Sequence, residues 1–253
     1  MVIVILIFIL IVVGIAWYLL SHDRGAKEPV GALWVAGGFG VAAVIAAAVL
    51  ESVVIPSGFL AGTLTGGAAL VPALAIGAIE ETLKFLPLAW FIYRKPYFNE
   101  YTDGIIYFAL CGLAFGLIEN VIYTMQYGTK TGLARIVLIP FFHSAATGTA
   151  GYYLVRTKLK AKPFGGVVAA VAILAVLHGL YDFGLASQVI QLAVLSIMIT
   201  VLLSVGLFLY FQHATELDER LGLSTVGVNK FCRACGRPNA NHTLYCEHCG
   251  KPA

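Results

Sequence analysis

Charged residues are scarce in this chain of 253 residues: they make up 11% of it, against roughly 25% in soluble domains. The hydrophobic fraction is 60% and the mean hydropathy is +0.89. This composition excludes an ordinary soluble domain and indicates a polytopic membrane protein. The net charge is only +3, so the sequence gives no basis for binding nucleic acid.

Cysteine is also rare, with five residues in the chain, and four of them form two Cys-x-x-Cys pairs near the C-terminus, at Cys232, Cys235, Cys246 and Cys249. A short turn in each pair aims two thiolates at one metal, which suits tetrahedral zinc. We therefore predict a zinc ribbon over residues 229–253. The alternative, two disulfides, requires an oxidising compartment. With four sulfur ligands, His242 and His248 are expected to be surface residues, and the lone Cys111 a packing residue.

Seven apolar runs of about 20 residues predict membrane-spanning helices, over residues 2–20, 30–50, 67–93, 104–127, 132–155, 165–186 and 189–212. The stretch 51–66 contains Pro56, Gly58 and Gly66 and is interpreted as a loop or, alternatively, a re-entrant segment. The first run has no basic segment before it and no small-residue cleavage pattern after it, so we interpret it as a retained helix. The fold class is thus an all-α, polytopic transmembrane bundle, followed by a polar linker at 213–228 and the ribbon.

The distribution of basic residues predicts the orientation. If the N-terminus lies outside the cell, all but three of the 16 Lys and Arg residues fall in inside segments. The exceptions are Lys130 and Arg135, assigned to outside segments, and Lys84 within the third span. Because inside loops carry an excess of Lys and Arg, we predict an outside N-terminus and a cytosolic C-terminus. A cytosolic ribbon favours zinc over disulfides.

Seven ionisable residues lie inside the predicted spans: Glu80, Glu81, Lys84, Glu119, His143, His178 and Asp182. A charge at bilayer depth costs at least a few kcal/mol, so such residues are rare, face inward and usually serve function. Asp103 and Arg94 lie at span ends and are expected to be solvated or interfacial.

Helical spacing suggests which of these residues share a face. Glu80 and Lys84 are four residues apart, whereas Glu81 lies about 100° around the helix, so one carboxylate is expected to pair with the lysine and the other to remain available. His178 and Asp182 are also four residues apart, so Asp182 either takes part directly or orients His178.

Four of these residues are also predicted to lie at a similar depth in the membrane. Counted along alternating spans at about 1.5 Å per residue, Glu80, Glu119, His143 and His178 fall within roughly one helical turn of a common level. Glu119 follows Gly112 and Gly116, whose spacing allows a neighbouring helix to approach closely. Carboxylates and histidines held there can activate water as general bases or ligate a divalent metal. The same groups could instead bind a proton or cation in a transporter, and each alone could be a structural hydrogen bond or ion pair.

Four motifs on successive helices resemble the PrsW family of intramembrane proteases, which is distantly similar to the type II CAAX prenyl endopeptidases and the Abi proteins; they are Glu80-Glu81-x-x-Lys84, Phe115-x-x-x-Glu119-Asn120, His143 and His178-x-x-x-Asp182. The resemblance covers about residues 30–212. It implies that Glu80 and Glu81 are catalytic, one activating water and the other pairing with Lys84. It also implies roles for Glu119, where the CAAX enzymes carry a histidine, for His143, and for the pair His178 and Asp182.

The resemblance further implies cleavage of membrane-anchored proteins such as anti-sigma factors, by a mechanism assigned both to metallopeptidases and to glutamic peptidases. The chain is therefore predicted to be a membrane-embedded endopeptidase with a structural zinc in the ribbon, with or without a second metal in the membrane site. The ribbon is expected to recruit substrate or a cytosolic protein. The competing interpretations are a proton- or cation-coupled transporter and a non-catalytic scaffold that presents the ribbon.

Overall fold

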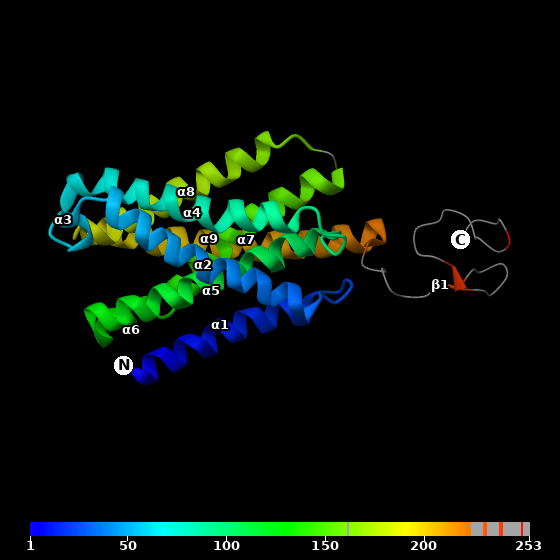
Figure 1. Ribbon diagram of the computed structural model, residues 1–253, viewed down its shortest axis with the longest axis horizontal. Helices are drawn as coiled ribbons and strands as arrows, with labels where there is room; N and C mark the ends of the chain where they lie inside the picture. The colour runs from blue at the N-terminus through cyan, green and yellow to red at the C-terminus, as the bar shows by residue number, and fades with distance from the viewer. Residues whose placement is uncertain (161, 224–229, 232–237, 240–248, 250–253) are drawn as a thin grey trace.

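A computed structural model describes residues 1–160, 162–223, 230–231, 238–239 and 249 (Figure 1). Within these residues the regular structure is helical except for one short antiparallel pair of strands, with short loops between the helices. The elements are α1 (Val2–His22), α2 (Val30–Val54), α3 (Ser57–Leu60), the 3-10 helix η1 (Gly66–Ala69), α4 (Leu70–Ile92), α5 (Tyr101–Tyr127), α6 (Thr129–Arg135), α7 (Leu138–Lys160), α8 (Gly165–Ala186), α9 (Ile190–Leu221), β1 (Lys230–Phe231) and β2 (Pro238–Asn239). The predicted all-α bundle is confirmed. Three of the four ribbon cysteines, Cys232, Cys235 and Cys246, lie outside the described residues, as do His242 and His248.

Five helices of the described chain, α1, α2, α5, α8 and α9, are long and apolar enough to cross a membrane, and the bent pair α6 and α7 makes a sixth candidate. Their outer surfaces are apolar: Trp34 is 78% exposed and Val53 is 80% exposed. The third predicted span is α4, which has 23 residues but carries three ionisable side chains. A multi-pass membrane protein is therefore confirmed, whereas the count of seven spans stays a prediction.

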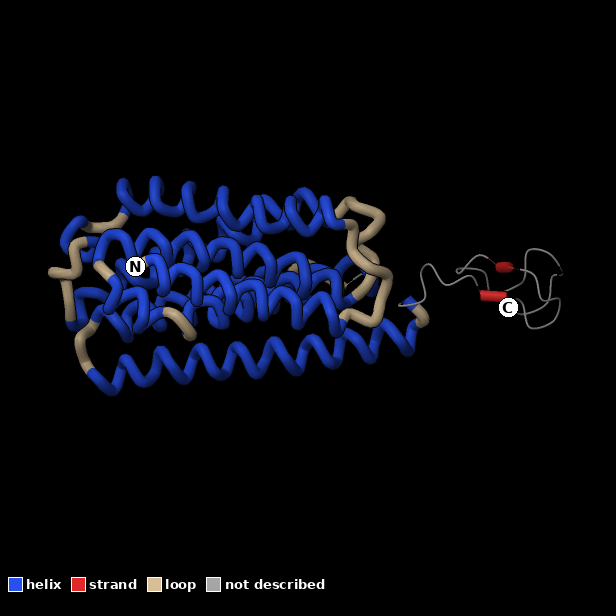
Figure 2. The backbone as a smooth tube through the Cα atoms, turned by 90° about the horizontal axis from the view of Figure 1, so that it is seen from below, coloured by secondary structure: helices blue, strands red, loops and turns tan. Residues whose placement is uncertain are grey.

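The structure corrects two of the predicted boundaries. The span 132–155 was expected to be one helix, but α6 and α7 meet at a bend of 47°. The last helix, α9, continues beyond residue 212 to Leu221 and runs the length of the bundle (Figure 2), so the first half of the predicted linker is helical. Gly222 ends α9 at φ 71°, a left-handed conformation that glycine adopts without a steric penalty.

The extension of α9 has a structural role at the start of α5. Asp218 of α9 is buried and accepts hydrogen bonds from the backbone N–H groups of Tyr101 (2.7 Å) and Thr102 (2.9 Å), which have no partner within their own helix. Asp103 was expected to be solvated, and this was wrong: it is 1% exposed and accepts a hydrogen bond from the backbone N–H of Glu100 at 2.7 Å. Both side chains thus accept hydrogen bonds from backbone N–H groups at the start of α5 and cap this helix.

Glu100 lies in the connection before α5 and is also buried. Its carboxyl accepts a hydrogen bond from the backbone N–H of Ala26 at 3.1 Å. Burial, together with the nearby charges of Asp218, Asp23 and Glu28, raises the pKa of Glu100 to about 7. This end of the bundle therefore contains a carboxyl group that titrates near neutrality.

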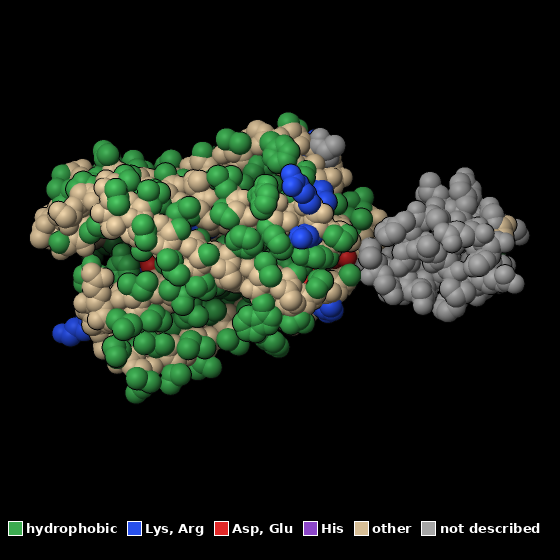
Figure 3. Space-filling view, viewed as in Figure 1, with side chains coloured by type: hydrophobic (Ala, Val, Ile, Leu, Met, Phe, Trp, Pro, Cys, Tyr) green, Lys and Arg blue, Asp and Glu red, His purple; other side chains and the backbone are tan. Residues whose placement is uncertain are grey.

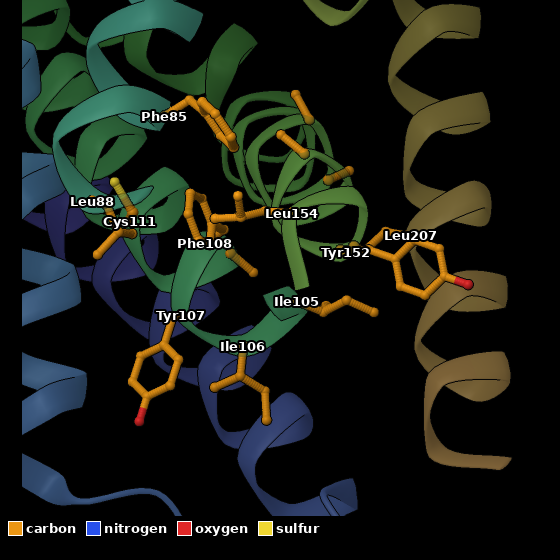
Figure 4. Close-up of a cluster of buried hydrophobic side chains, with 14 of the residues drawn as sticks. Phe85, Leu88, Ile105, Ile106, Tyr107, Phe108, Cys111, Tyr152, Leu154 and Leu207 are labelled. Carbon is orange, nitrogen blue, oxygen red and sulfur yellow. The ribbon is translucent and has the colours of Figure 1, made fainter. Parts of the chain in front are cut away.

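The hydrophobic core surrounds α5, which α1, α2, α7 and α9 contact. Figure 4 shows Phe85 of α4, Phe108 of α5 and Leu154 of α7 gathered in this core, and the rings of Phe85 and Phe108 lie 5.4 Å apart between centroids. Cys111 is fully buried there, which confirms it as a packing residue. The core fixes the helices on which the ionisable residues lie.

Candidate active site

Lys84 lies at the centre of the intramembrane polar residues and is fully buried. Its ammonium group is 2.9 Å from Glu80 Oε2, from Glu81 Oε1 and from His143 Nδ1, and lies 4.0 Å from the centre of the Phe115 ring. The expectation that only one of the two carboxylates pairs with Lys84 was therefore wrong. One cation holds both glutamates and connects α4 to α7.

His143 is positioned by the close contact of α5 and α7. A Cβ atom on Gly112 would collide with the backbone carbonyl of His143, and one on Gly116 would lie 2.8 Å from the His143 ring. The absence of side chains at these two positions lets the histidine reach Glu119, whose Oε2 lies 2.8 Å from His143 Nε2. The small residues predicted to allow helix contact thus bring the imidazole into the site.

His178 faces the same cluster from α8. Its Nδ1 is 2.8 Å from Glu81 Oε1, and its Nε2 is 3.6 Å from both Glu80 Oε2 and Asp182 Oδ2. The carboxylate that orients His178 is therefore Glu81. Asp182, four residues along the helix, stands at 3.6 Å, outside hydrogen-bond range.

Aromatic rings hold the two imidazoles in place. Phe142 packs edge-on against His143 and His178, with centroid separations of 5.4 Å and 4.9 Å, and stacks on Tyr181 at 4.5 Å. The two imidazole centroids are 5.3 Å apart. Packing of this kind locks side-chain conformations, as a preorganised site requires.

Sequence reasoning missed Arg135, which was assigned to a segment outside the membrane. Its side chain is only 12% exposed and forms an ion pair with Glu119. Its Nε donates a hydrogen bond to Asn120 Oδ1 at 2.9 Å, and its guanidinium lies 3.9 Å from the centre of the Tyr123 ring. The signal was present in the sequence, because Arg135 falls within the predicted span 132–155.

Glu51 at the end of α2 was missed as well. Its Oε1 is buried without a hydrogen-bond partner among the described residues, and its charge interacts with those of Glu80, Asp182 and Glu119. It was placed in the predicted loop 51–66, whereas α2 continues to Val54. A lone acid within an apolar helix was the available signal.

The site is most exposed on the side of Asp182. The side chain of Asp182 is 22% exposed and that of Glu119 is 14% exposed, whereas Lys84 is 0% exposed. Figure 3 shows a hollow at one end of the bundle, between the α3 segment and α6, with an acidic side chain inside it. The cluster is therefore most accessible from the Asp182 side.

Three of these residues fit a divalent metal. Glu80, His143 and His178 each offer one ligand atom, and these atoms lie within 4.8 Å of one another in a buried position. Ionised carboxylates only accept hydrogen bonds, so the contacts with Glu119 and Glu81 leave lone pairs on His178 Nε2 and on His143 Nδ1, the second of which accepts a hydrogen bond from Lys84 in this structure. Two imidazoles and one carboxylate form a donor set found in catalytic zinc sites, and carboxylates that orient the histidines are usual around such metals.

Comparison with known proteins identifies the family to which the chain belongs. Residues 28–210 match the family model described as PrsW family intramembrane metalloprotease. The chain belongs to this family. Membership confirms the resemblance inferred from the four motifs. The predicted zinc ribbon, residues 229–253, lies beyond the matched residues.

Three curated relatives, each described as protease PrsW, show the extent of the similarity. The protein of Bacillus subtilis (strain 168) is 31% identical over 120 residues, which cover 47% of this chain and 55% of that protein. The Geobacillus kaustophilus protein is 28% identical over 172 residues, covering 68% of this chain and 74% of that protein. The Clostridioides difficile protein is 30% identical over 183 residues, with the same coverage of 68% and 74%. The chain thus spans about half the length of the first relative, and no solved structure matches it.

Proposed function

We propose that this protein is an endopeptidase that hydrolyses peptide bonds of membrane-anchored proteins, and that the cluster on α4, α5, α7 and α8 is its active site. The observation that carries the proposal is the convergence of Glu80, His143 and His178, whose ligand atoms lie within 4.8 Å of one another. Each histidine is held by a separate carboxylate, which is the arrangement of a preorganised site rather than of scattered packing contacts.

In this mechanism, Glu80, His143 Nδ1 and His178 Nε2 would hold a divalent metal. A metal bound there would lower the pKa of water and polarise the scissile carbonyl. Glu81 and Glu119 keep the two imidazoles oriented. Lys84 neutralises Glu80 and Glu81, and its contact with His143 Nδ1 would have to break for that atom to bind the metal.

Asp182 is the residue we assign to proton transfer. It is the most exposed carboxylate among the predicted site residues and faces His178 Nε2 at 3.6 Å, as Glu80 Oε2 also does. A water molecule between these groups lies within reach of Asp182, which accepts its proton and then donates that proton to the leaving amine. The protein thereby supplies both base and acid from one carboxyl group.

A second candidate mechanism, of the glutamic type, is favoured by the position of Lys84. Its ammonium group already lies against both glutamates and His143 Nδ1, so the cluster contains a cation of its own. In this mechanism Glu80 takes the proton of water, His178 stabilises the tetrahedral intermediate, and the proton passes through Asp182 to the leaving amine.

The proposed test combines metal content with cleavage of a membrane-anchored reporter. The purified full-length protein is compared with a chain truncated before Phe231 and, within that truncated chain, with Glu80→Gln and with Glu216→Gln, a matched control at an exposed position on α9. Metal that survives truncation, disappears in Glu80→Gln and is needed for cleavage supports the metal site. Cleavage that depends on Glu80 after all metal has been removed supports the glutamic type. Cleavage at the wild-type rate by a folded Glu80→Gln variant contradicts both mechanisms.

The C-terminal segment completes the proposal. The four cysteines Cys232, Cys235, Cys246 and Cys249 bind one structural zinc, as their spacing supports, and the ribbon recruits substrate or a cytosolic partner. The membrane domain extends to Leu221, where α9 ends. The distribution of Lys and Arg supports an outside N-terminus and a cytosolic ribbon.

A further inference from the structure

A groove separate from the active site runs between α4 and α8. It has a volume of about 630 Å³ and is lined mainly by apolar side chains, among them Phe85, Ala89 and Ala172, with Leu154 of α7 also contributing. Arg94 lies among its lining residues at the end of α4. The groove lies on the outside of the bundle, where the exposed side chains are apolar.

The shape of the groove follows from the way in which α4 and α8 cross. A Cβ atom on Gly77 would collide with the backbone of α8 at Ala175 and Gly179, and one on Gly179 would collide with α4 at Leu74. The two backbones therefore touch at this crossing and separate on the Arg94 side of it, and Figure 1 shows the first half of α8 diverging from α4. The groove occupies the space between the diverging halves.

The crossing separates the groove from the active site. Glu81 and His178 are 2% and 3% exposed, although Thr82 and Ala175, close to them in sequence, line the groove. An occupant of the groove therefore does not reach the catalytic cluster, which is most exposed on the side of Asp182. This argues against the groove as the route of the scissile peptide.

The groove is shorter than the hydrocarbon core of a bilayer. Its lining runs from Ala78 to Arg94 on the α4 side and from Phe164 to Ala175 on the α8 side, which correspond to helix rises of about 24 Å and about 17 Å at 1.5 Å per residue, whereas the core is about 30 Å thick and one leaflet about 15 Å. A membrane-spanning substrate helix would need a path through both leaflets, but the groove ends at the crossing. A lipid acyl chain needs a path through only one leaflet.

The charge at the open end of the groove indicates which kind of lipid headgroup would bind there. Arg94 is exposed, its guanidinium lies 5.8 Å from the centre of the Trp90 ring, and it forms no ion pair within the described part of the chain. Tyr93 lines the groove beside it. Tryptophan and tyrosine favour the membrane interface, and an arginine there attracts anionic headgroups.

We propose that this groove binds an anionic phospholipid, with one acyl chain against Phe85, Ala89 and Ala172 and the phosphate at Arg94. The site requires no catalysis, so its test is independent of the proposed protease activity.

The test measures lipid retained by the purified full-length protein. Phosphatidylglycerol and phosphatidylcholine are titrated separately, and bound lipid is counted by native mass spectrometry. Arg94→Gln is expected to weaken phosphatidylglycerol binding about fivefold, the typical contribution of one basic residue near a membrane surface, and to leave phosphatidylcholine unchanged. The matched control Arg220→Gln removes an exposed arginine from α9 and should have no effect. Equal binding of both lipids, or no change in Arg94→Gln, would overturn the proposal.

Filling the groove provides a second variant that does not depend on charge. Ala172→Phe should reduce retention of phosphatidylglycerol, whereas Ala169→Phe, at an exposed position of α8 outside the groove, should not. A photo-crosslinking residue at position 172 should form adducts with lipid in cell membranes. Adducts with a membrane protein instead would assign the groove to a protein partner and refute the lipid site.

Discussion

Removing Arg135 is the most informative perturbation of the site, because this residue acts through Glu119 on His143. In Arg135→Gln, Glu119 loses its ion pair and keeps the contact with His143 Nε2 at 2.8 Å. Breaking a buried pair by removing one partner costs about 3–5 kcal/mol. Since the Glu119 side chain is 14% exposed and retains one partner, we expect a loss of about 2–3 kcal/mol in unfolding free energy.

Arg135→Gln should lower activity by more than the small increase in the unfolded fraction of the protein would account for. Residues that orient a metal-binding histidine typically contribute 10- to 100-fold to metal affinity or activity. We therefore expect kcat/KM for reporter cleavage to fall about 10- to 100-fold, with metal affinity falling in parallel. Arg135→Lys keeps the charge but loses the hydrogen bond from Nε to Asn120, so it should recover part of both quantities.

The assay needs a control on the same helix. Lys130→Gln removes an exposed cation from α6 and should change the unfolding free energy by less than about 0.5 kcal/mol. Unfolding in detergent, metal titration and cleavage are measured on the same preparations. If Arg135→Gln kept wild-type metal affinity and cleavage while Glu119→Gln lost both, Arg135 would have no positioning role.

Three further perturbations test the packing of the bundle, the first beside the site and the other two at the start of α5. Gly112→Ala forces a Cβ atom against the backbone of α7 and should cost about 1–3 kcal/mol and lower cleavage, whereas Gly14→Ala, with open space around it, should do neither. Native Glu100 has a pKa of about 7 against 4.5 in the unfolded chain, so it binds its proton more tightly when folded. The unfolding free energy should therefore fall as the pH rises between these values, by at most about 3 kcal/mol, and Glu100→Gln should flatten this dependence in unfolding measured at pH 4.5 and 8. Asp218→Asn weakens the cap on α5 and should lower the unfolding free energy by about 1 kcal/mol, while Glu216→Gln on the exposed side of α9 should not; equal values for the two would rule out the cap.

Much of the fold could be predicted because it depends on local patterns. Apolar runs of bilayer length are sufficient to place helices such as α2 and α8, and the predicted span 165–186 coincides with Gly165–Ala186. The break between α6 and α7 and the continuation of α9 to Leu221 were not predicted. Each places a polar residue in contact with another segment, Arg135 with Glu119 and Asp218 with the start of α5, and such contacts are not visible in a local pattern.

The candidate site, like the fold, could be predicted only in part from the sequence. A shared depth indicated that Glu80, Glu119, His143 and His178 could meet, because the rise per residue is fixed in a helix. Depth alone cannot say which atoms face one another, since that depends on how each helix is rotated and on how closely its neighbours approach. Gly112 and Gly116 fix the approach of α7, and only the packed structure assigns Glu81 rather than Asp182 to orient His178.

The sequence by itself determined that this protein is a helical membrane protein, that it carries ionisable residues at one depth, and that its motifs belong to an intramembrane protease family. These conclusions follow from residue types and helical spacing, which act locally. Only the tertiary structure decided that Lys84 holds both glutamates, that Arg135 belongs to the site, and that α4 and α8 diverge into a groove. Each of these depends on contacts between helices, where the cost of a buried charge or of a colliding Cβ atom is decided by the neighbouring helix.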